Sequence, residues 1–169
     1  MSTPHVVVVM GVAGTGKTTI GPLLAARLGV PYAEGDDFHP QANIAKMSAG
    51  HPLTDDDRWP WLDAIGRWAH ERHGLGGVVS SSALKRSYRD ILVHGRDDIR
   101  IVFLNGTQDL IADRLAARKG HFMPPGLLTS QFKTLEPPQP AERPITVSID
   151  APVEAIVDDI IRQLNRTPE

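Results

Sequence analysis

Short runs of apolar residues alternate along this chain with longer segments in which apolar and polar positions repeat with helical spacing. The runs cover residues 5–10, 30–33, 77–82, 99–104 and 145–149. A continuous apolar run of this length is typical of a strand that is buried on both faces of a parallel sheet. Between the runs, apolar side chains recur every three or four residues, as on one face of an α-helix. The alternation predicts a doubly wound α/β fold, with five parallel strands and helices on both faces of the sheet.

The first helix is expected over residues 20–28, and Gly29 is a suitable residue to end it. Pro22 disturbs this segment, because proline has no N–H to donate to the Thr18 carbonyl and its ring crowds that group. We therefore expect a kink or a late helix start. Further helices are expected over residues 39–47, 61–73, from 85 onward, over 107–119 and 127–135, and from a cap at Asp150 to 164.

The segment between the first strand and the first helix carries a glycine-rich motif. It reads G-x-x-x-x-G-K-T, which is the spacing of a phosphate-binding P-loop when it lies between a strand and a helix. Glycines let consecutive backbone N–H groups turn toward an anion, and the following helix offers unpaired N–H groups of its own. Lys17 would reach the β- and γ-phosphates of ATP, and the Thr18 hydroxyl would bind Mg²⁺. The candidate nucleotide-binding residues are Gly11, Val12, Ala13, Gly14, Thr15, Gly16, Lys17, Thr18 and Thr19.

Acidic residues follow the second predicted strand, in the stretch Glu34-Gly35-Asp36-Asp37. In open α/β sheets, ligands bind at the carboxyl ends of the strands. The third predicted strand ends in serines and the fourth runs into Asn105-Gly106, so neither brings a carboxylate to this edge. Asp36 is therefore the best candidate for binding Mg²⁺ or for orienting a substrate hydroxyl, with Glu34 and Asp37 behind it.

Four basic residues follow predicted elements that end at the same edge of the sheet. They are Lys46, Arg58, Lys85 and Arg89. Taken singly, each is an ordinary surface cation, but a cluster of them would suit an anionic second substrate. The acids at positions 55–57 are as typical of the first turn of a helix as of a metal site.

A basic helix end leads into a proline-containing segment near residue 120. Arg114 and Arg118 lie one turn apart on the predicted helix, and Gly120 ends it. Many small phosphotransferases build a mobile lid from such a segment, which we place at about residues 118–135. In a lid, Arg118 would neutralise charge that develops on the transferred phosphoryl group. A cation that stabilises the C-terminus of its helix is an equally good interpretation.

Composition narrows the class of protein further. The length of 169 residues suits one domain over 1–169, and the net charge of −2 argues against a general nucleic-acid binder. The longest apolar run, residues 6–13, is too short to span a membrane and lacks the basic start of a signal peptide. The absence of cysteine excludes disulfides and thiolate metal sites and suits a reducing compartment. We expect a soluble, intracellular α/β domain with neither a membrane nor a nucleic-acid partner.

The segments that follow the P-loop resemble the gluconokinase family of small P-loop kinases over nearly the whole length of the chain. The P-loop itself is shared by many enzymes, whereas these segments are specific to that family. The resemblance rests on residues 35–40, 43–47, 50–62, 82–85 with 88–89, 114–122, 127–128, 130–132 and 135–136.

The resemblance implies a P-loop kinase three-layer fold and transfer of the ATP γ-phosphate to the terminal hydroxyl of D-gluconate, giving 6-phosphogluconate. It also implies a cytoplasmic, dimeric enzyme. By similarity to the related shikimate kinases, Asp36 would orient and deprotonate the acceptor hydroxyl, Arg58 would hold the substrate, and Arg114 would pack on adenine.

The resemblance and the residue pattern together define the candidate site. The catalytic candidates are Lys17, Asp36 and Arg118, and the metal candidates are Thr18 and Asp36. The substrate-binding candidates are Asp36, His39, Lys46, Arg58, Ser82, Lys85 and Arg89. The chain departs from the family pattern at Glu34, where relatives usually have aspartate, and at Ser81, where many have cysteine.

Two other functions remain open at this point. One is a P-loop kinase for another acceptor, such as shikimate or a nucleoside monophosphate, although those families lack the segment 39–62 in this form. The other is a nucleotide-dependent switch or binding module without catalysis. The chain has no Asn-Lys-x-Asp stretch for reading guanine, and the basic cluster would then have no purpose.

Overall fold

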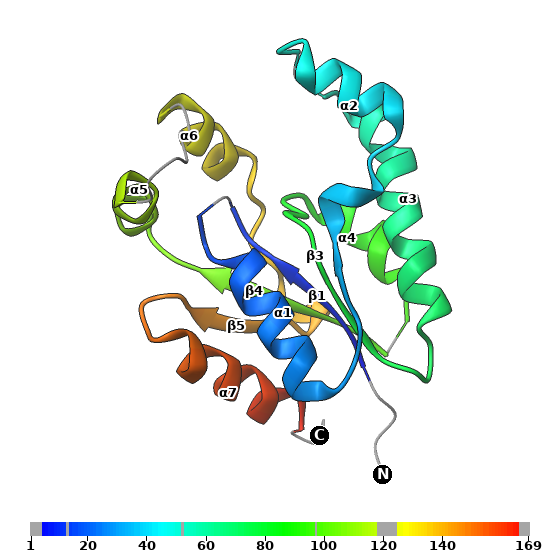
Figure 1. Ribbon diagram of the computed structural model, residues 1–169, viewed down its shortest axis with the longest axis vertical. Coiled ribbons are helices and arrows are strands. Elements are labelled where there is room, and N and C mark those ends of the chain that lie inside the picture. The colour runs from blue at the N-terminus through cyan, green and yellow to red at the C-terminus, as the bar shows by residue number, and fades with distance from the viewer. Residues whose placement is uncertain (1–4, 13, 52, 97, 118–124, 166–169) are drawn as a thin grey trace.

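The structure is a computed structural model that describes residues 5–12, 14–51, 53–96, 98–117 and 125–165. Its centre is a parallel sheet of five strands in the order β2-β3-β1-β4-β5 (Figure 1). The expected five-stranded parallel sheet is therefore confirmed. The strands are β1 (Val6–Met10), β2 (Tyr32–Glu34), β3 (Gly77–Ser80), β4 (Ile99–Asn105) and β5 (Ile145–Ser148).

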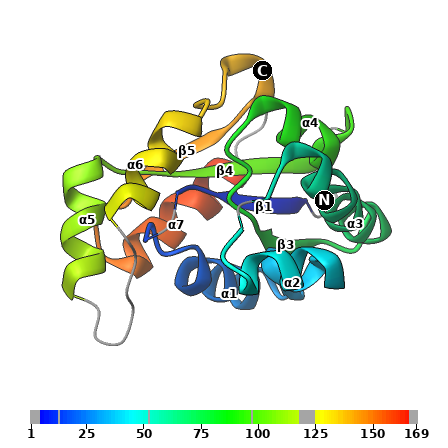
Figure 2. The same cartoon turned by 90° about the horizontal axis from the view of Figure 1, so that it is seen from above.

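Helices cover both faces of the sheet, as the buried apolar runs require (Figure 2). Alternate residues of β1 belong to different clusters, because successive side chains of a strand point to opposite faces. Val7 and Val9 pack with α1 (Lys17–Leu28) and α7 (Val153–Leu164), whereas Val6 and Val8 pack with α3 (Asp55–Glu71) and α4 (Arg86–Val93). The sheet thus lies between two apolar layers.

The first helix corrects one expectation from the sequence. It begins at Lys17 and runs to Leu28 with Pro22 inside it, so the late start is wrong. Gly16 precedes it with a left-handed φ of 95°, and Gly29 ends it with a φ of 70°, as expected for a glycine in that position.

The last helix also differs from expectation at its start. Its N-terminal cap is Pro152 and not Asp150, and it ends at Leu164. The third strand ends at Ser80, two residues earlier than expected, so that Ser81 and Ser82 lie in the loop that follows.

Two helical regions stand on either side of the loop between β1 and α1 (Figures 1 and 2). One consists of α2 (Gln41–Ser48) with the start of α3, and the other consists of α5 (Gln108–Ala117) with α6 (Pro125–Thr134). A short 3-10 helix, η1 (Gly35–Phe38), connects β2 to α2, and another, η2 (Pro140–Glu142), precedes β5. Among the described residues, no helix is long and apolar enough to cross a membrane.

Candidate active site

The P-loop holds its shape through contacts with its own backbone. The ammonium group of Lys17 donates to the carbonyl oxygens of Gly11 at 2.8 Å and Val12 at 3.0 Å. The buried hydroxyl of Thr15 donates to the Val12 carbonyl at 2.9 Å. Gly14 has a left-handed φ of 82°, which side chains rarely adopt, and a Cβ there would lie 2.9 Å from Leu115. The loop therefore needs glycine at this position for two independent reasons.

The charge of Lys17 links the P-loop to the acidic residues beyond β2. Burial lowers the pKa of Lys17 to about 8, and the negative charges of Asp36 and Glu34 oppose this shift. Both carboxylates therefore act on the ammonium group that the sequence assigns to the phosphates. Thr18 and Thr19 lie exposed in the first turn of α1.

The position of Asp36 depends on the glycine before it. A Cβ on Gly35 would lie 2.1 Å from the backbone oxygen of Ser80, so only glycine allows η1 to pack this closely on the end of β3. The indole N–H of Trp61 donates to the Gly35 carbonyl at 2.8 Å and fixes the other side of the turn. Asp36 itself is exposed, beside the P-loop.

Glu34 ends β2 and is bonded on both of its carboxylate oxygens. The Tyr32 hydroxyl donates to Oε2 at 2.8 Å, and the Ser80 hydroxyl donates to Oε1 at 2.9 Å. Sequence reasoning missed Tyr32 and Ser80. Positions 32 and 34 share one face of a strand, but nothing in the sequence indicates that residue 80 pairs with them.

His39 ends η1 and contacts side chains of both α2 and α3. Its ring stacks on Trp61 at 4.2 Å between centroids, and its Nδ1 lies 3.3 Å from the side-chain amide of Asn43. Burial and the charge of Arg58 lower the pKa of His39, whereas Asp36 raises it. Trp61 is a core residue, as expected, and also supports this histidine.

Asp55 holds two of the predicted substrate-binding cations together. Its carboxylate lies 3.5 Å from Arg58 and 3.3 Å from Lys85, and it accepts a hydrogen bond from the Tyr88 hydroxyl. Both cations lie over the Tyr88 ring, at 5.7 Å and 5.5 Å from its centroid. We call Arg58 and Lys85 the cation pair.

Lys46 makes its own ion pair, with Asp57 at 2.6 Å. Asp57 also completes a capping box with Thr54 at the start of α3, so the helix-capping interpretation of this acid is confirmed. The hydrogen bond from Lys46 and those from Thr54 lower the pKa of Asp57 to about 2.

The structure gives Arg89 a different place from the one expected. Its side chain is 1% exposed, and it donates to the two carboxylate oxygens of Glu142 at 2.7 Å and 3.2 Å. It also donates to the carbonyl of Ala83 at 2.9 Å. All three contacts are within the protein, so Arg89 joins α4 to the segment before β5. Ser82 lies half-buried in the loop before α4.

The far side of the P-loop holds the remaining nucleotide candidates. Arg114 on α5 donates to the backbone oxygen of Ile149, at the end of β5. Next to it, the ends of β4 and β5 border an open pocket of about 340 Å³ lined by Asn105, Gly106, Thr107, Leu110, Ser148 and Asp150. Ala13, Arg118 and the first part of the expected lid lie outside the described residues.

The donor chemistry of the site suits Mg²⁺. No group of three or more histidine, cysteine or acidic side chains within the described ranges could hold a metal ion alone. Mg²⁺ is usually bound by one or two carboxylates together with substrate phosphates and water, and it prefers hard oxygen donors. Asp36, Glu34 and the Thr18 hydroxyl are donors of this kind beside the P-loop.

Comparison with known proteins identifies the relatives of this chain. The family model for shikimate kinase matches residues 13–165. The gluconokinase of Gluconobacter oxydans (strain 621H) is 48% identical over 94% of this chain and 90% of its own length. The thermoresistant gluconokinase of Escherichia coli (strain K12) is 40% identical over 96% of this chain and 94% of its own.

Solved structures agree with these matches. A gluconokinase from Sinorhizobium meliloti 1021 superposes with a TM-score of 0.87 at 47% identity, covering 97% of this chain and 93% of that one. A shikimate kinase from Bacteroides thetaiotaomicron superposes with a TM-score of 0.69 at 18% identity, covering 96% and 99%, which shows a shared fold. The resemblance noted in the sequence is therefore confirmed.

Proposed function

This chain belongs to the gluconokinase family, and from that premise we propose how its residues transfer the γ-phosphate of ATP to the terminal hydroxyl of D-gluconate, giving 6-phospho-D-gluconate and ADP. One observation is the main support for this proposal. Asp36 acts electrostatically on Lys17, Asp36 and Arg58 both act on His39, and Asp55 lies within ion-pair distance of Arg58 and Lys85. These interactions therefore link a phosphate-binding lysine to a pair of cations for an anionic acceptor.

In this proposal the P-loop residues 11–19 bind the triphosphate of ATP. The backbone N–H groups surround the β-phosphate, and Lys17 exchanges its two carbonyl acceptors for phosphate oxygens. Thr18 and Asp36 would hold Mg²⁺ with the phosphates. When bound, this ion neutralises charge on the β- and γ-phosphates.

Gluconate is an anion near neutral pH, so its carboxylate would bind to the cation pair. Arg58 can offer two parallel N–H donors to a carboxylate, and Lys85 adds a second charge. Lys46, His39 and Ser82 would contact the hydroxyl groups along the chain of the acid. Asp36 would then orient the terminal hydroxyl toward the γ-phosphorus and accept its proton. Because of its contacts with Glu142, we give Arg89 a supporting and not a direct role.

The adenine ring would lie against Arg114, next to the open pocket at the ends of β4 and β5. Arg118 would approach the transferred phosphoryl group from the lid at about residues 118–135, as a cation that stabilises the developing charge. We further propose that the single domain over 1–169 works as a homodimer in the cytoplasm, which light scattering and cell fractionation would test.

The experiment that tests the function is a coupled assay of ADP release with gluconate, shikimate or a nucleoside monophosphate as acceptor. We expect release with gluconate. Release with shikimate alone would assign the enzyme to the shikimate acceptor class, and no stimulation by any acceptor would favour a nucleotide-binding module.

Three substitutions separate the roles within the site. Lys17→Ala should abolish turnover, and Asp36→Asn should mainly lower kcat, because substrate can still bind without the carboxylate. Arg58→Ala should raise KM for gluconate more than KM for ATP. Wild-type turnover in Asp36→Asn, or an equal rise of both KM values in Arg58→Ala, would contradict the assigned roles.

A further inference from the structure

Three side chains form a ring of polar contacts at the ends of β2 and β3, and in this ring the two hydroxyl protons of Tyr32 and Ser80 can both be donated to the ionised Glu34 carboxylate. Tyr32 and Ser80 each contact a different oxygen of Glu34, at 2.8 Å and 2.9 Å, and their own hydroxyl oxygens lie 2.7 Å apart. Ser80 is fully buried, whereas Tyr32 and Glu34 are half-buried. The ring therefore sits at the boundary between the core and the open edge of the sheet.

The ring brings a carboxylate to a strand that has none of its own. β3 is the neighbour of β1, which leads into the P-loop, and it ends in Ser80. Glu34 is paired with Ser80 in the register of β2 and β3 and reaches over to its hydroxyl. Glu34 is the last residue of β2, at the edge of the sheet that carries the P-loop, and its charge acts on the Lys17 ammonium group.

The hydrogen bonds orient Glu34 without saturating it. An ionised carboxylate has about four acceptor positions on its two oxygens. Tyr32 and Ser80 occupy one position on each oxygen, which leaves one on each oxygen for a cation or its bound water. Without these donors, the glutamate side chain would keep more of its rotamer freedom and would have to be ordered when the ion binds.

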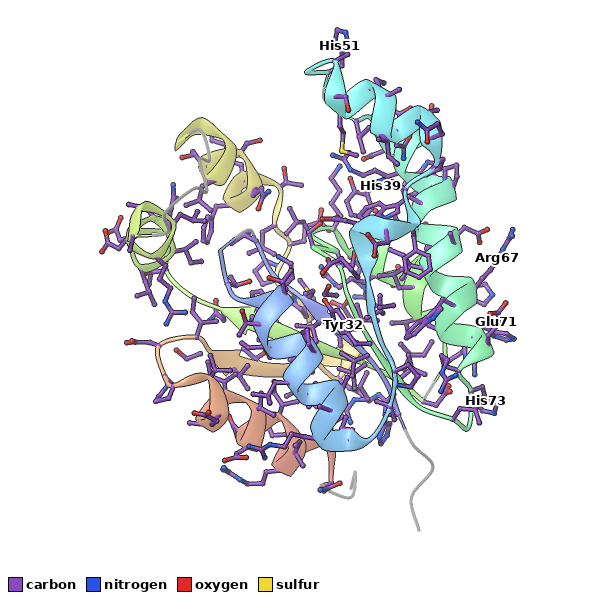
Figure 3. The ribbon with its side chains drawn as sticks, viewed as in Figure 1. Tyr32, His39, His51, Arg67, Glu71 and His73 are labelled. Carbon is purple, nitrogen blue, oxygen red and sulfur yellow. The ribbon has the colours of Figure 1, made fainter. Side chains whose placement is uncertain are left out.

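Tyr32 is itself held firmly. The aromatic side chain of Tyr32 packs against α1 at Gly21 (Figure 3). A Cβ added to Gly21 would lie 2.5 Å from Cε1 of the tyrosine. Burial, together with the hydrogen bond and charge of Glu34, raises the pKa of Tyr32 to about 12.

We propose that Tyr32 and Ser80 are positioning residues, which hold the Glu34 carboxylate in the orientation that binds the hydrated Mg²⁺ of the nucleotide complex. The inference rests on the proposed function as an ATP-dependent kinase that uses Mg²⁺. It gives the hydroxyl groups of Tyr32 and Ser80 a task in metal affinity, beyond their contribution to packing.

The test measures binding of ADP by calorimetry, with and without MgCl₂ and without gluconate. Tyr32→Phe keeps the ring on Gly21 and removes only the hydroxyl. Because removing a residue that orients a metal ligand typically lowers metal affinity by 10- to 100-fold, we expect Tyr32→Phe to reduce the Mg²⁺-dependent gain in ADP affinity roughly tenfold. ADP affinity without Mg²⁺ should stay at the wild-type value. Ser87→Ala, which removes an exposed hydroxyl on α4, is the control and should change neither quantity.

The same substitution in a Glu34→Gln protein shows whether Tyr32 acts on Mg²⁺ binding by way of Glu34. In Glu34→Gln the Mg²⁺-dependent gain should already be reduced, and adding Tyr32→Phe should reduce it no further. Ser80→Ala replaces Tyr32→Phe if the latter does not fold. The inference would be overturned if the Mg²⁺-dependent gain in ADP affinity were unchanged in Tyr32→Phe or in Glu34→Gln. It would also be overturned if Tyr32→Phe reduced this gain equally in the wild type and in Glu34→Gln. Failure of the proposed function would instead leave these results intact and would appear as no gluconate-dependent ADP release by the wild type.

Discussion

The buried pair of Arg89 and Glu142 leads to a prediction that separates stability from substrate binding. Arg89 was expected to bind substrate, yet its side chain is 1% exposed and meets Glu142, which is 7% exposed, through two hydrogen bonds. Replacing Arg89 by methionine keeps much of its volume and removes its charge. Glu142 would then lack the cation that faces it, while the backbone N–H of Gln139 and the more distant Arg86 remain nearby.

The expected magnitude follows from this burial. Removing one partner of a buried ion pair costs about 3–5 kcal/mol of the free energy of unfolding, because the remaining charge is uncompensated. For a domain of about 150–250 residues, each kcal/mol lowers Tm by about 2–4 °C. Arg89→Met should therefore lower Tm by about 6–20 °C. The matched control is Arg67→Ala, which removes an arginine whose side chain is 78% exposed, and its effect should be within about 0.5 kcal/mol.

Two assays distinguish a stabilising role of Arg89 from a role in substrate binding. Unfolding in urea gives the change in free energy, and steady-state kinetics below the melting range gives KM for gluconate, which should stay close to wild type. An unchanged stability together with a raised KM for gluconate would refute the reasoning and return Arg89 to the substrate site.

The same pair predicts the direction of a pH effect. Burial alone would raise the pKa of Glu142, but the hydrogen bonds from Arg89 and Gln139 outweigh it and lower the pKa below the ordinary glutamate value. A group with a lowered pKa in the folded state stabilises the protein above its unfolded pKa and loses that contribution as pH falls through the folded pKa. Wild-type stability should therefore decline below about pH 4, and Glu142→Gln should lack this part of the decline.

Three further predictions concern the site and its supports. Burial lowers the pKa of Lys17 to about 8 and bound phosphates would raise it, so ATP binding should take up a proton above pH 8 and the Kd for ATP should rise by up to about tenfold per pH unit. Calorimetry in buffers of different ionisation enthalpy measures the proton uptake. A Kd for ATP that does not change with pH, in the wild type as in Lys17→Arg, would contradict this prediction. Gly35→Ala should lower kcat strongly, because its Cβ would lie 2.1 Å from the Ser80 oxygen and displace Asp36. Wild-type kcat in this variant would contradict the assigned role of the turn. Thr54→Ala removes the capping hydroxyl of α3 and should cost about 1 kcal/mol in urea unfolding, and an undiminished stability would show that the capping box contributes nothing.

Features that depend on neighbours in sequence could be predicted well. The apolar runs locate the strands because both faces of a parallel sheet are buried. The P-loop motif contains its own glycines, lysine and threonine within eight positions, so its conformation follows from local residues. Asp36 could be placed near the P-loop because the carboxyl ends of parallel strands share one edge.

Features that depend on partners far along the chain could not be predicted. Arg89 and Glu142 are separated by 53 positions, and Tyr32 and Ser80 by 48. The spacing of Arg89 after Lys85 is the same whether its guanidinium faces a ligand or a buried carboxylate. Only the position of η2 in space distinguishes the two, and that position depends on how β4 and β5 pair.

The cations of the site fall into two groups according to what they would lose when a ligand arrives. Lys46 and the cation pair, Arg58 and Lys85, are partly exposed and meet exposed or half-buried acids, and ion pairs of this kind contribute only about 0–1 kcal/mol. A gluconate carboxylate or a phosphate can therefore replace their partners at little cost. Arg89 is buried with Glu142, so the same exchange would leave a buried carboxylate unpaired. The burial of the partner, more than the charge of the residue, decides which cations can take part in binding.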